Sequence, residues 1–312
     1  FAGSNDFSKS AIDKTVKRAL EIAESSASHN AEEDKIELDA LKPVRATYKT
    51  PIKEDPFKVS LNEKMEILLE ADKKQRVGPK IAISQTSFSA HKEKKIFAST
   101  IGSLIEQEIV WCGAGIEASA VEGQDFQNRQ YPMSNGHYQT RGFEFVREMD
   151  LVGNAERIGE EAVALLSADE CPSGVYDIIL EGSQLALQVH ESAGHPTELD
   201  RALGYEASYA GTSFMTPDLL GKLKYGSKIV NITHDATLPG GLGTFGFDDE
   251  GVPAERVFLV KNGQFVDYLT SRETAKYLQK TLKGYKKNSN GTMRASSWSR
   301  MPLIRMTNVN LE

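Results

Sequence analysis

The sequence predicts an α+β fold in two domains, each combining an antiparallel sheet with packed helices. With 312 residues, the chain is long enough to bury two hydrophobic cores. Residues 80–131 are rich in β-branched and aromatic residues separated by Gly and Ser, which is typical of antiparallel strands joined by turns. Segments with helical periodicity precede and follow this region.

Two helices are predicted in the first 80 residues. Apolar residues recur at helical spacing over residues 9–28, where Ser10 is placed to cap the helix. A second helix is predicted over residues 60–76, with Ser60 as its cap. Between them, residues 29–59 are polar and contain three prolines, which favours loops with short extended pieces.

Four strands and a third helix are predicted next. The strands are Ile81–Phe88, Lys95–Ser99, Leu104–Ile116 and Ile116–Val121. After a break, apolar residues step by four, three, four and three residues, which predicts a helix from Leu151 to Leu165. Residues 171–174 supply a turn, so the domains are expected to be residues 1–170 and 171–312.

The second domain is predicted to mix strands with two helices. One helix begins near Gln184, after a turn at Glu181–Ser183, and leads into His190. Another runs from Ser271 to about Gln279. The Asn262-Gly263 pair, between two apolar runs, is the strongest short-range signal for a hairpin. The predicted strands are Val175–Leu180, Lys228–Thr233, Val257–Val260 and Phe265–Leu269.

Charge and composition exclude several classes of protein. The formal net charge is -7 and no dense Lys/Arg block occurs, which argues against binding to nucleic acid. No apolar run approaches the ~20 residues of a membrane-spanning helix, and no leader is apparent. The two cysteines, Cys112 and Cys171, are too few for a disulfide framework. We therefore expect a cytoplasmic protein, without a membrane partner, that acts on small molecules or peptides.

The segment His190–His195 carries the clearest chemical signal. Its two imidazoles are ligands that suit zinc, and Glu191, beside the first, is placed to take a proton from water that the metal activates. Downstream, Glu198 and Asp200 are candidates for further ligands or for carboxylates that orient the imidazoles. The alternatives are an unligated histidine pair and, for the two carboxylates, a solvated helix end.

The spacing of the histidines has a structural consequence. Residues four apart lie about 40° apart around a helix, whereas residues five apart lie about 140° apart. For His190 and His195 to share an ion, the helix must widen to an i→i+5 turn or end between them. Gly194 is the point at which the backbone yields most easily.

Other patterns in the sequence are weaker. The loop Gly241–Gly246 matches a nucleotide-binding glycine pattern, but an acidic turn follows it instead of a helix, so we reject that function. A flexible loop beside a substrate cleft is favoured over a plain surface loop. The remaining histidines have no motif partner and are expected to be structural; they are His29, His91, His137 and His234.

Taken in order, these motifs resemble the TldD/PmbA family, modulators of DNA gyrase that act as metalloproteases. The resemblance rests on His190-Glu191 with Gly194-His195 and Glu198, and it covers essentially the whole chain. Further matching segments are Phe1–Ser8, Gly142–Glu144, Asp248–Gly251 and Arg305–Asn308.

The resemblance implies a two-domain zinc peptidase that threads an extended peptide into a cavity closed by dimerisation. It implies His190 and His195 as zinc ligands and Glu191 as the general base. The partner is expected to be a second copy, or a PmbA/TldE-like chain that lacks the histidine motif. The resemblance also places four further residues near the cleft, namely Asp248, Asp249, Arg305 and Asn308.

The chain departs from the family at its ends. The family's third zinc ligand is a cysteine near the C-terminus, and nothing after Arg305 matches it. Either the 312 residues belong to a longer chain, which we favour, or Glu198 substitutes. The predicted function is zinc-dependent peptide-bond hydrolysis. The alternatives are a non-catalytic partner subunit that binds peptides by strand addition and a metal-dependent amidase or esterase.

Overall fold

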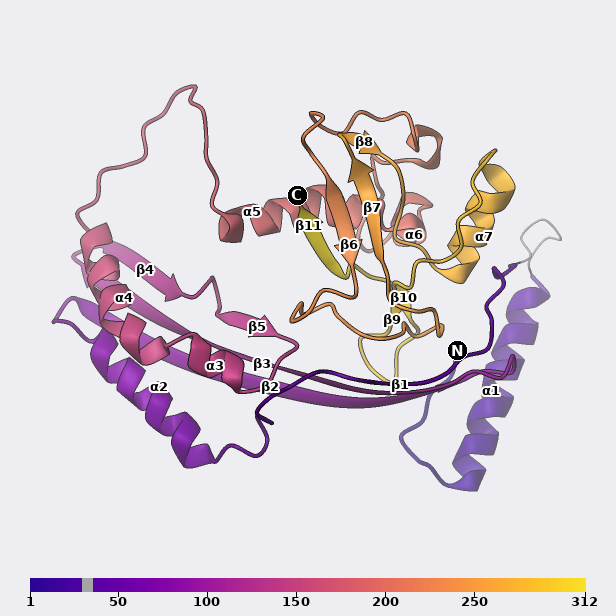
Figure 1. Ribbon diagram of the computed structural model, residues 1–312, viewed down its shortest axis with the longest axis horizontal. Helices are drawn as coiled ribbons and strands as arrows, with labels where there is room; N and C mark the ends of the chain where they lie inside the picture. The colour runs from indigo at the N-terminus through magenta and orange to yellow at the C-terminus, as the bar shows by residue number, and fades with distance from the viewer. Residues whose placement is uncertain (30–35) are drawn as a thin grey trace.

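A long antiparallel strand pair runs through the structure, a computed structural model that describes residues 1–29 and 36–312. Strands β2 (Ile81–Ala98) and β3 (Leu104–Glu122) pair over almost their whole length and form the curved ribbon of Figure 1. The sequence predicts four shorter strands here, and that prediction is wrong. The polar middle of β2 stays in the sheet because Lys92 and Lys94 pair across the strands with Glu108.

The remaining strands of this sheet all pair with β3. Strand β1 (Arg45–Lys49) runs parallel to it, whereas β4 (Asp125–Tyr131) and β5 (His137–Gln139) run antiparallel. The sheet is therefore mostly antiparallel, as predicted. Strand β1 is one of the short extended pieces expected within residues 29–59, of which residues 30–35 lie outside the described part.

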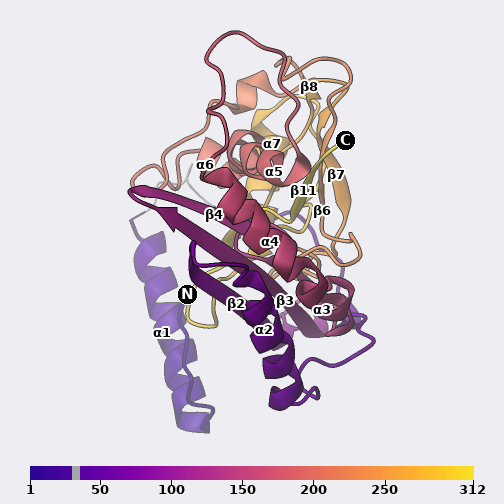
Figure 2. The same ribbon diagram turned by 90° about the vertical axis from the view of Figure 1, so that its left-hand side faces the viewer.

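Three helices pack on this sheet. Helix α2 (Leu61–Gln75) begins after Ser60, whose hydroxyl accepts the Glu63 N–H, so both the helix and its cap are confirmed. It lies beside α4 (Leu151–Leu165), as Figure 2 shows, and α3 (Glu144–Glu148) precedes α4. The buried side chains of this core include Ala114, Ile116, Ala118, Phe143, Leu151 and Ile158.

Helix α1 (Lys9–Ala27) matches the predicted helix but is capped differently. Ser8 has an extended backbone and accepts the Ala11 N–H, whereas Ser10 is already helical, so the predicted cap is wrong. None of its residues is buried. Within residues 1–29 and 36–312, no helix is both long enough and apolar enough to cross a bilayer.

A second, four-stranded antiparallel sheet has the order β11-β6-β7-β8. The predicted hairpin is confirmed, with the Asn262-Gly263 turn between β7 and β8. Its second strand is shorter than predicted because the Leu269 N–H bonds to Thr197 outside the hairpin. Strand β6 begins later than predicted because the Val230 N–H closes a turn with Ser227. The bounds are β6 Ile232–Asp235, β7 Arg256–Lys261, β8 Gln264–Phe265 and β11 Asn308–Leu311.

Helices and a short strand pair complete this part of the chain. The helix predicted from Ser271 to about Gln279 is confirmed as α7 (Arg272–Thr281), and Ser271 serves as its cap. The short pair is β9 (Met293–Arg294) with β10 (Leu303–Ile304). The other helical segments are α5 (Gly182–Val189), α6 (Leu199–Ala202) and a 3₁₀ turn, Pro217–Leu219. A second core is formed by residues between Ala193 and Ile304, separate from the core between Ala71 and Ala162.

The predicted strand at Val175–Leu180 is absent. This segment belongs to the long connection between α4 and α5 seen in Figure 1, and Val175 and Ile179 are fully exposed. A strand needs a neighbour for its backbone hydrogen bonds, and none of the strands in the described part of the chain pairs with these residues.

Candidate metal centre

The two motif histidines meet because helix α5 widens at its end. The His195 N–H bonds to the carbonyl of His190, an i→i+5 bond, and residues His190–Gly194 form a single π-helical turn. The predicted distortion is therefore confirmed. A 3₁₀ turn, His195–Thr197, follows directly.

Pro196 explains why the regular helix cannot continue. It has no N–H with which to reach the carbonyl of Ser192, four residues earlier. The Tyr225 hydroxyl donates to that carbonyl instead, at 2.9 Å. The Thr197 hydroxyl lies 2.8 and 2.9 Å from the carbonyls of Ala193 and Gly194. The distortion was expected at Gly194, and the contribution of Pro196 was not predicted, although proline is among the usual causes of a break in a helix.

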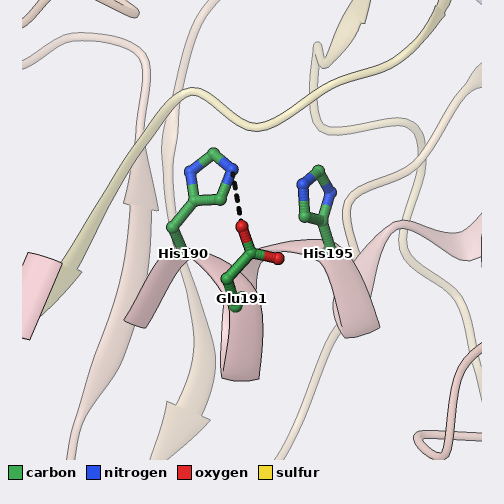
Figure 3. Close-up of side chains that lie close together, drawn as sticks. All are labelled: His190, Glu191 and His195. Carbon is green, nitrogen blue, oxygen red and sulfur yellow. Dashed lines mark ion pairs between the residues drawn. The ribbon is translucent and has the colours of Figure 1, made fainter. Parts of the chain in front are cut away.

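The side chains of His190, Glu191 and His195 converge above this turn (Figure 3). The two imidazole rings are perpendicular, with centroids 4.7 Å apart, and Glu191 Oε1 lies 4.0 Å from His190 Nε2. One ligand atom from each residue lies within 4.8 Å of the others. Two imidazoles and a carboxylate this close match the nitrogen and oxygen ligands that zinc takes in proteins.

The three side chains differ in how much of their surface is exposed to solvent. Glu191 is 60% exposed, His190 49% and His195 29%, so the carboxylate is the group most open to solvent. All three side chains are at least partly exposed, so water can reach the carboxylate and both rings.

Glu198 is hydrogen-bonded to the His195 ring. Its Oε2 lies 2.9 Å from His195 Nδ1, and the carboxylate is completely buried. Because a carboxylate only accepts hydrogen bonds, this contact favours the tautomer with the proton on Nδ1 and a free lone pair on Nε2; Arg201 Nη2 also lies 3.2 Å from Nδ1. Arg201 donates to the same Oε2 from Nε and Nη2, at 3.1 and 3.0 Å. Glu198 therefore fixes the orientation and tautomer of the ring.

Asp200 is buried but does not contact either histidine. Its carboxylate accepts the backbone N–H groups of Arg201 and Ile304, at 2.8 and 3.3 Å. Burial raises the pKa of Asp200 to about 6. It thus joins α6 to β10, and neither Glu198 nor Asp200 lies at a solvated helix end.

His190 lines a pocket of about 620 Å³ beside the glycine-rich loop. Asn308 also lines it and fixes the loop, since its Oδ1 accepts the Gly243 N–H at 2.8 Å and its Nδ2 donates to the Asp235 carbonyl at 2.7 Å. The expected position of this loop beside a cleft is in agreement with the structure. His234 is buried and contacts Thr307 instead of the motif.

The other expected cleft residues lie elsewhere. Arg305 lines a second pocket, of about 880 Å³, and lies 3.3 Å from Glu206 and 3.9 Å from Glu198. Asp249 lines neither pocket and pairs with Lys95 at 2.8 Å.

Asp248 forms the buried centre of the acidic turn. Its carboxylate accepts three backbone N–H groups, from Glu250, Val252 and Met293, at 2.9, 2.9 and 3.1 Å. It lines neither pocket, so its position indicates a structural contribution to the turn.

The stability of the protein is expected to depend on the titration of Asp248. Burial raises the pKa of this carboxyl from 3.8 to about 7. Between these values the folded state holds more protons than the unfolded state. Its contribution to the free energy of unfolding therefore falls as the pH rises, by at most about 1.4 kcal/mol per pH unit. Urea unfolding of wild type and Asp248→Asn at pH 5 and pH 8 measures this contribution. The stability of wild type relative to the variant should be lower at pH 8 than at pH 5. A difference between the two proteins that is the same at both pH values would contradict a raised pKa for Asp248.

Gly194→Ala is expected to destabilise the motif turn. A Cβ at this position would collide with the side chain of Met306, which packs against the glycine. Overpacking of this kind costs about 1–3 kcal/mol. A double-mutant cycle with Met306→Ala, followed by urea unfolding, should show a favourable coupling, because the smaller side chain removes the collision. Additive effects would contradict this explanation.

Both parts of the chain match family models. Residues 54–168 match the model of the PmbA/TldA metallopeptidase central domain. Residues 173–312 match the model of the PmbA/TldA metallopeptidase C-terminal domain.

Curated relatives extend this likeness over nearly the whole chain. A metalloprotease of Methanocaldococcus jannaschii is 33% identical, with 99% of this chain and 63% of the relative aligned. A metalloprotease of Methanothermobacter thermautotrophicus is 30% identical, with 82% of this chain and 52% of the relative aligned. A metalloprotease TldD homolog of Buchnera aphidicola is 28% identical, with 99% and 60% aligned. The chain thus spans between about half and two thirds of the length of these relatives.

Solved structures share the fold. A proposed modulator of DNA gyrase from Thermotoga maritima superposes with a TM-score of 0.70 at 19% identity, over 96% of this chain and 61% of that chain. TldE from Thermococcus kodakarensis superposes with a TM-score of 0.61 at 17% identity, over 99% of this chain and 64% of that chain.

Proposed function

This chain belongs to the TldD/PmbA metallopeptidase family, and we propose that it is a zinc-dependent chain that hydrolyses peptide bonds in extended or unfolded peptides. One observation carries the proposal: ligand atoms of His190, Glu191 and His195 converge within 4.8 Å at an exposed π-helical turn.

In this proposal His190 and His195 hold the metal, and Glu198 orients His195 through Nδ1. Bound zinc acts as a Lewis acid that acidifies water and polarises the scissile carbonyl. Glu191 takes the proton of the attacking water and delivers it to the departing amine. The Glu191 side chain is 60% exposed, so it can exchange protons with water, and its Oε1 lies 4.0 Å from His190 Nε2, beside the proposed metal.

The substrate is proposed to be an extended peptide. The pocket that His190 lines is bordered by β5 residues Tyr138 and Gln139 and by Asn308 and Asn310 of β11. Strand edges offer backbone groups that pair with a peptide in the extended conformation. Cleavage rates measured with peptides of increasing length separate this function from that of an amidase or esterase, because a small-molecule hydrolase would show no gain with length.

Metal analysis tests the proposal directly. The purified full-length protein is expected to contain near-stoichiometric zinc and to lose peptide hydrolysis when a chelator removes it. A protein that binds peptides but contains no zinc would instead be a non-catalytic partner subunit.

We further propose that the protein acts as a dimer, either with a second copy or with a PmbA/TldE-like chain, in the cytoplasm. The structural likeness to TldE supports such a pairing of related chains. The free thiol of Cys171, which is exposed, is typical of a reducing compartment. The mass of the purified complex, measured by light scattering with and without the candidate partner, tests the assembly.

A further inference from the structure

The second pocket lies between the long strands and the C-terminal part of the chain. Its floor is formed by β2 and β3, including His91 and Trp111, whose rings stack with centroids 5.4 Å apart. Its walls come from the glycine-rich loop and from residues 294–305. At about 880 Å³ it is larger than the pocket beside His190.

The charges that line this pocket are mainly positive. It contains four cationic side chains and one carboxylate, Glu93. Two of the cations, Lys95 and Arg305, are neutralised by carboxylates outside the pocket. For Arg294 and Arg300, no carboxylate in the described part of the chain lies within the 4.0 Å of an ion pair.

Arg294 is the more unusual of these two cations. Its Nε is buried and has no hydrogen-bond partner among the described residues. The guanidinium lies over the Phe245 ring, 5.6 Å from the centroid, and donates to the Met306 carbonyl. Burial lowers the pKa of Arg294 and neighbouring Arg305 lowers it further, whereas the carboxylates of Asp249 and Glu198 act in the opposite direction. Because Arg294 is largely buried and forms no ion pair within the described residues, an anion in the pocket would stabilise its charge.

The pocket adjoins the candidate metal centre. Leu242 lines both pockets. Trp111, on the floor of the larger pocket, packs edge-to-face against Tyr138 of the smaller one, with centroids 5.9 Å apart. A peptide with its reacting bond near His190 can therefore place a residue further along the chain in the larger pocket.

We propose that the larger pocket binds a carboxylate of the peptide substrate, with Arg294 and Arg300 as its cationic partners. The inference rests on the proposed peptidase function, of which it specifies the substrate class. The aromatic rings of Trp111 and Phe245 supply a nonpolar surface for the rest of the bound residue. The carboxylate belongs either to the peptide C-terminus or to an acidic side chain.

Peptide binding to full-length Glu191→Gln protein tests this inference without turnover. Four fluorescent peptides of one sequence carry a free or amidated C-terminus, each combined with Glu or Gln at one internal position. Loss of the recognised carboxylate is expected to weaken binding by about 10- to 100-fold, since hydrogen bonds to charged groups are lost. If amidation of the C-terminus weakens binding, the recognised carboxylate is the C-terminal one; if replacement of Glu by Gln does, it is the acidic side chain.

Substitutions then assign the effect to the pocket. Arg300→Gln and Arg294→Met should each reduce the preference for the carboxylate peptide, whereas Arg18→Gln on α1 should retain it. Arg300 is exposed, so its variant provides a test even if Arg294→Met proves to be unfolded by circular dichroism. Equal affinity for charged and neutral peptides, or no binding at all, would overturn the inference.

This experiment separates the two proposals. Preference for the carboxylate peptide, in a protein whose wild type hydrolyses nothing, would support the pocket and contradict the proposed function. Hydrolysis by wild type without any charge preference would contradict the pocket alone.

Discussion

Glu191→Gln is expected to abolish peptide hydrolysis while leaving the zinc content unchanged. Glutamine has nearly the same shape as glutamate but cannot take a proton from water. General acid–base catalysis contributes about 100- to 10,000-fold to a rate, so kcat should fall by that factor. The affinity for zinc should persist because, in the proposed site, the two imidazoles hold the metal. Steady-state kinetics and metal analysis on the same preparation measure both quantities.

A matched control makes this result specific. Glu160→Gln removes the same charge from the exposed surface of α4, remote from the motif, and should retain both activity and zinc. Turnover close to wild type in Glu191→Gln would refute Glu191 as the base. Loss of zinc together with activity would indicate that Glu191 is a ligand instead.

His190→Ala and His195→Ala are each expected to remove the metal. Mutation of a group that only supports a ligand already costs about 10- to 100-fold in metal affinity. Removal of a ligand itself should therefore cost at least about 100-fold. The loss should be at least as large for His195, because the ring that Glu198 orients disappears with it. Competition with a chromophoric chelator measures the dissociation constant.

The control for these variants is His29→Ala, at the exposed end of α1, which should keep the wild-type zinc affinity. Far-UV circular dichroism should show that the variants remain folded, since both motif rings are at least partly exposed. A double histidine variant that still binds one zinc with wild-type affinity would place the metal elsewhere in the protein.

Much of the secondary structure was predictable because its signals are local. The periodicity of residues 151–165, the cap at Ser60 and the Asn262-Gly263 turn depend only on neighbours in sequence. The widened turn was predictable for the same reason, since it follows from the five-residue spacing of the two histidines.

The two largest failures involve partners that are distant in sequence, whereas the cap misplaced at Ser10 is a local error. The apolar run at 175–180 has the composition of a strand, but a strand exists only where a second one pairs with it. Conversely, the polar centre of β2 has the composition of a break between two strands. Glu108 of β3 nevertheless forms ion pairs with Lys92 and Lys94 and keeps this segment in the sheet.

The sequence alone thus determined which groups can do chemistry: two imidazoles, a carboxylate beside the first, and a spacing that forbids a regular helix. The tertiary structure decided how they are held and what surrounds them. Tyr225 bonds to the widened turn, Met306 packs on Gly194, and Arg294 lines a pocket whose floor is built by β2 and β3. These contacts join residues tens to hundreds of positions apart. They arise from packing and charge compensation in three dimensions, which leave no periodic or local pattern in the chain.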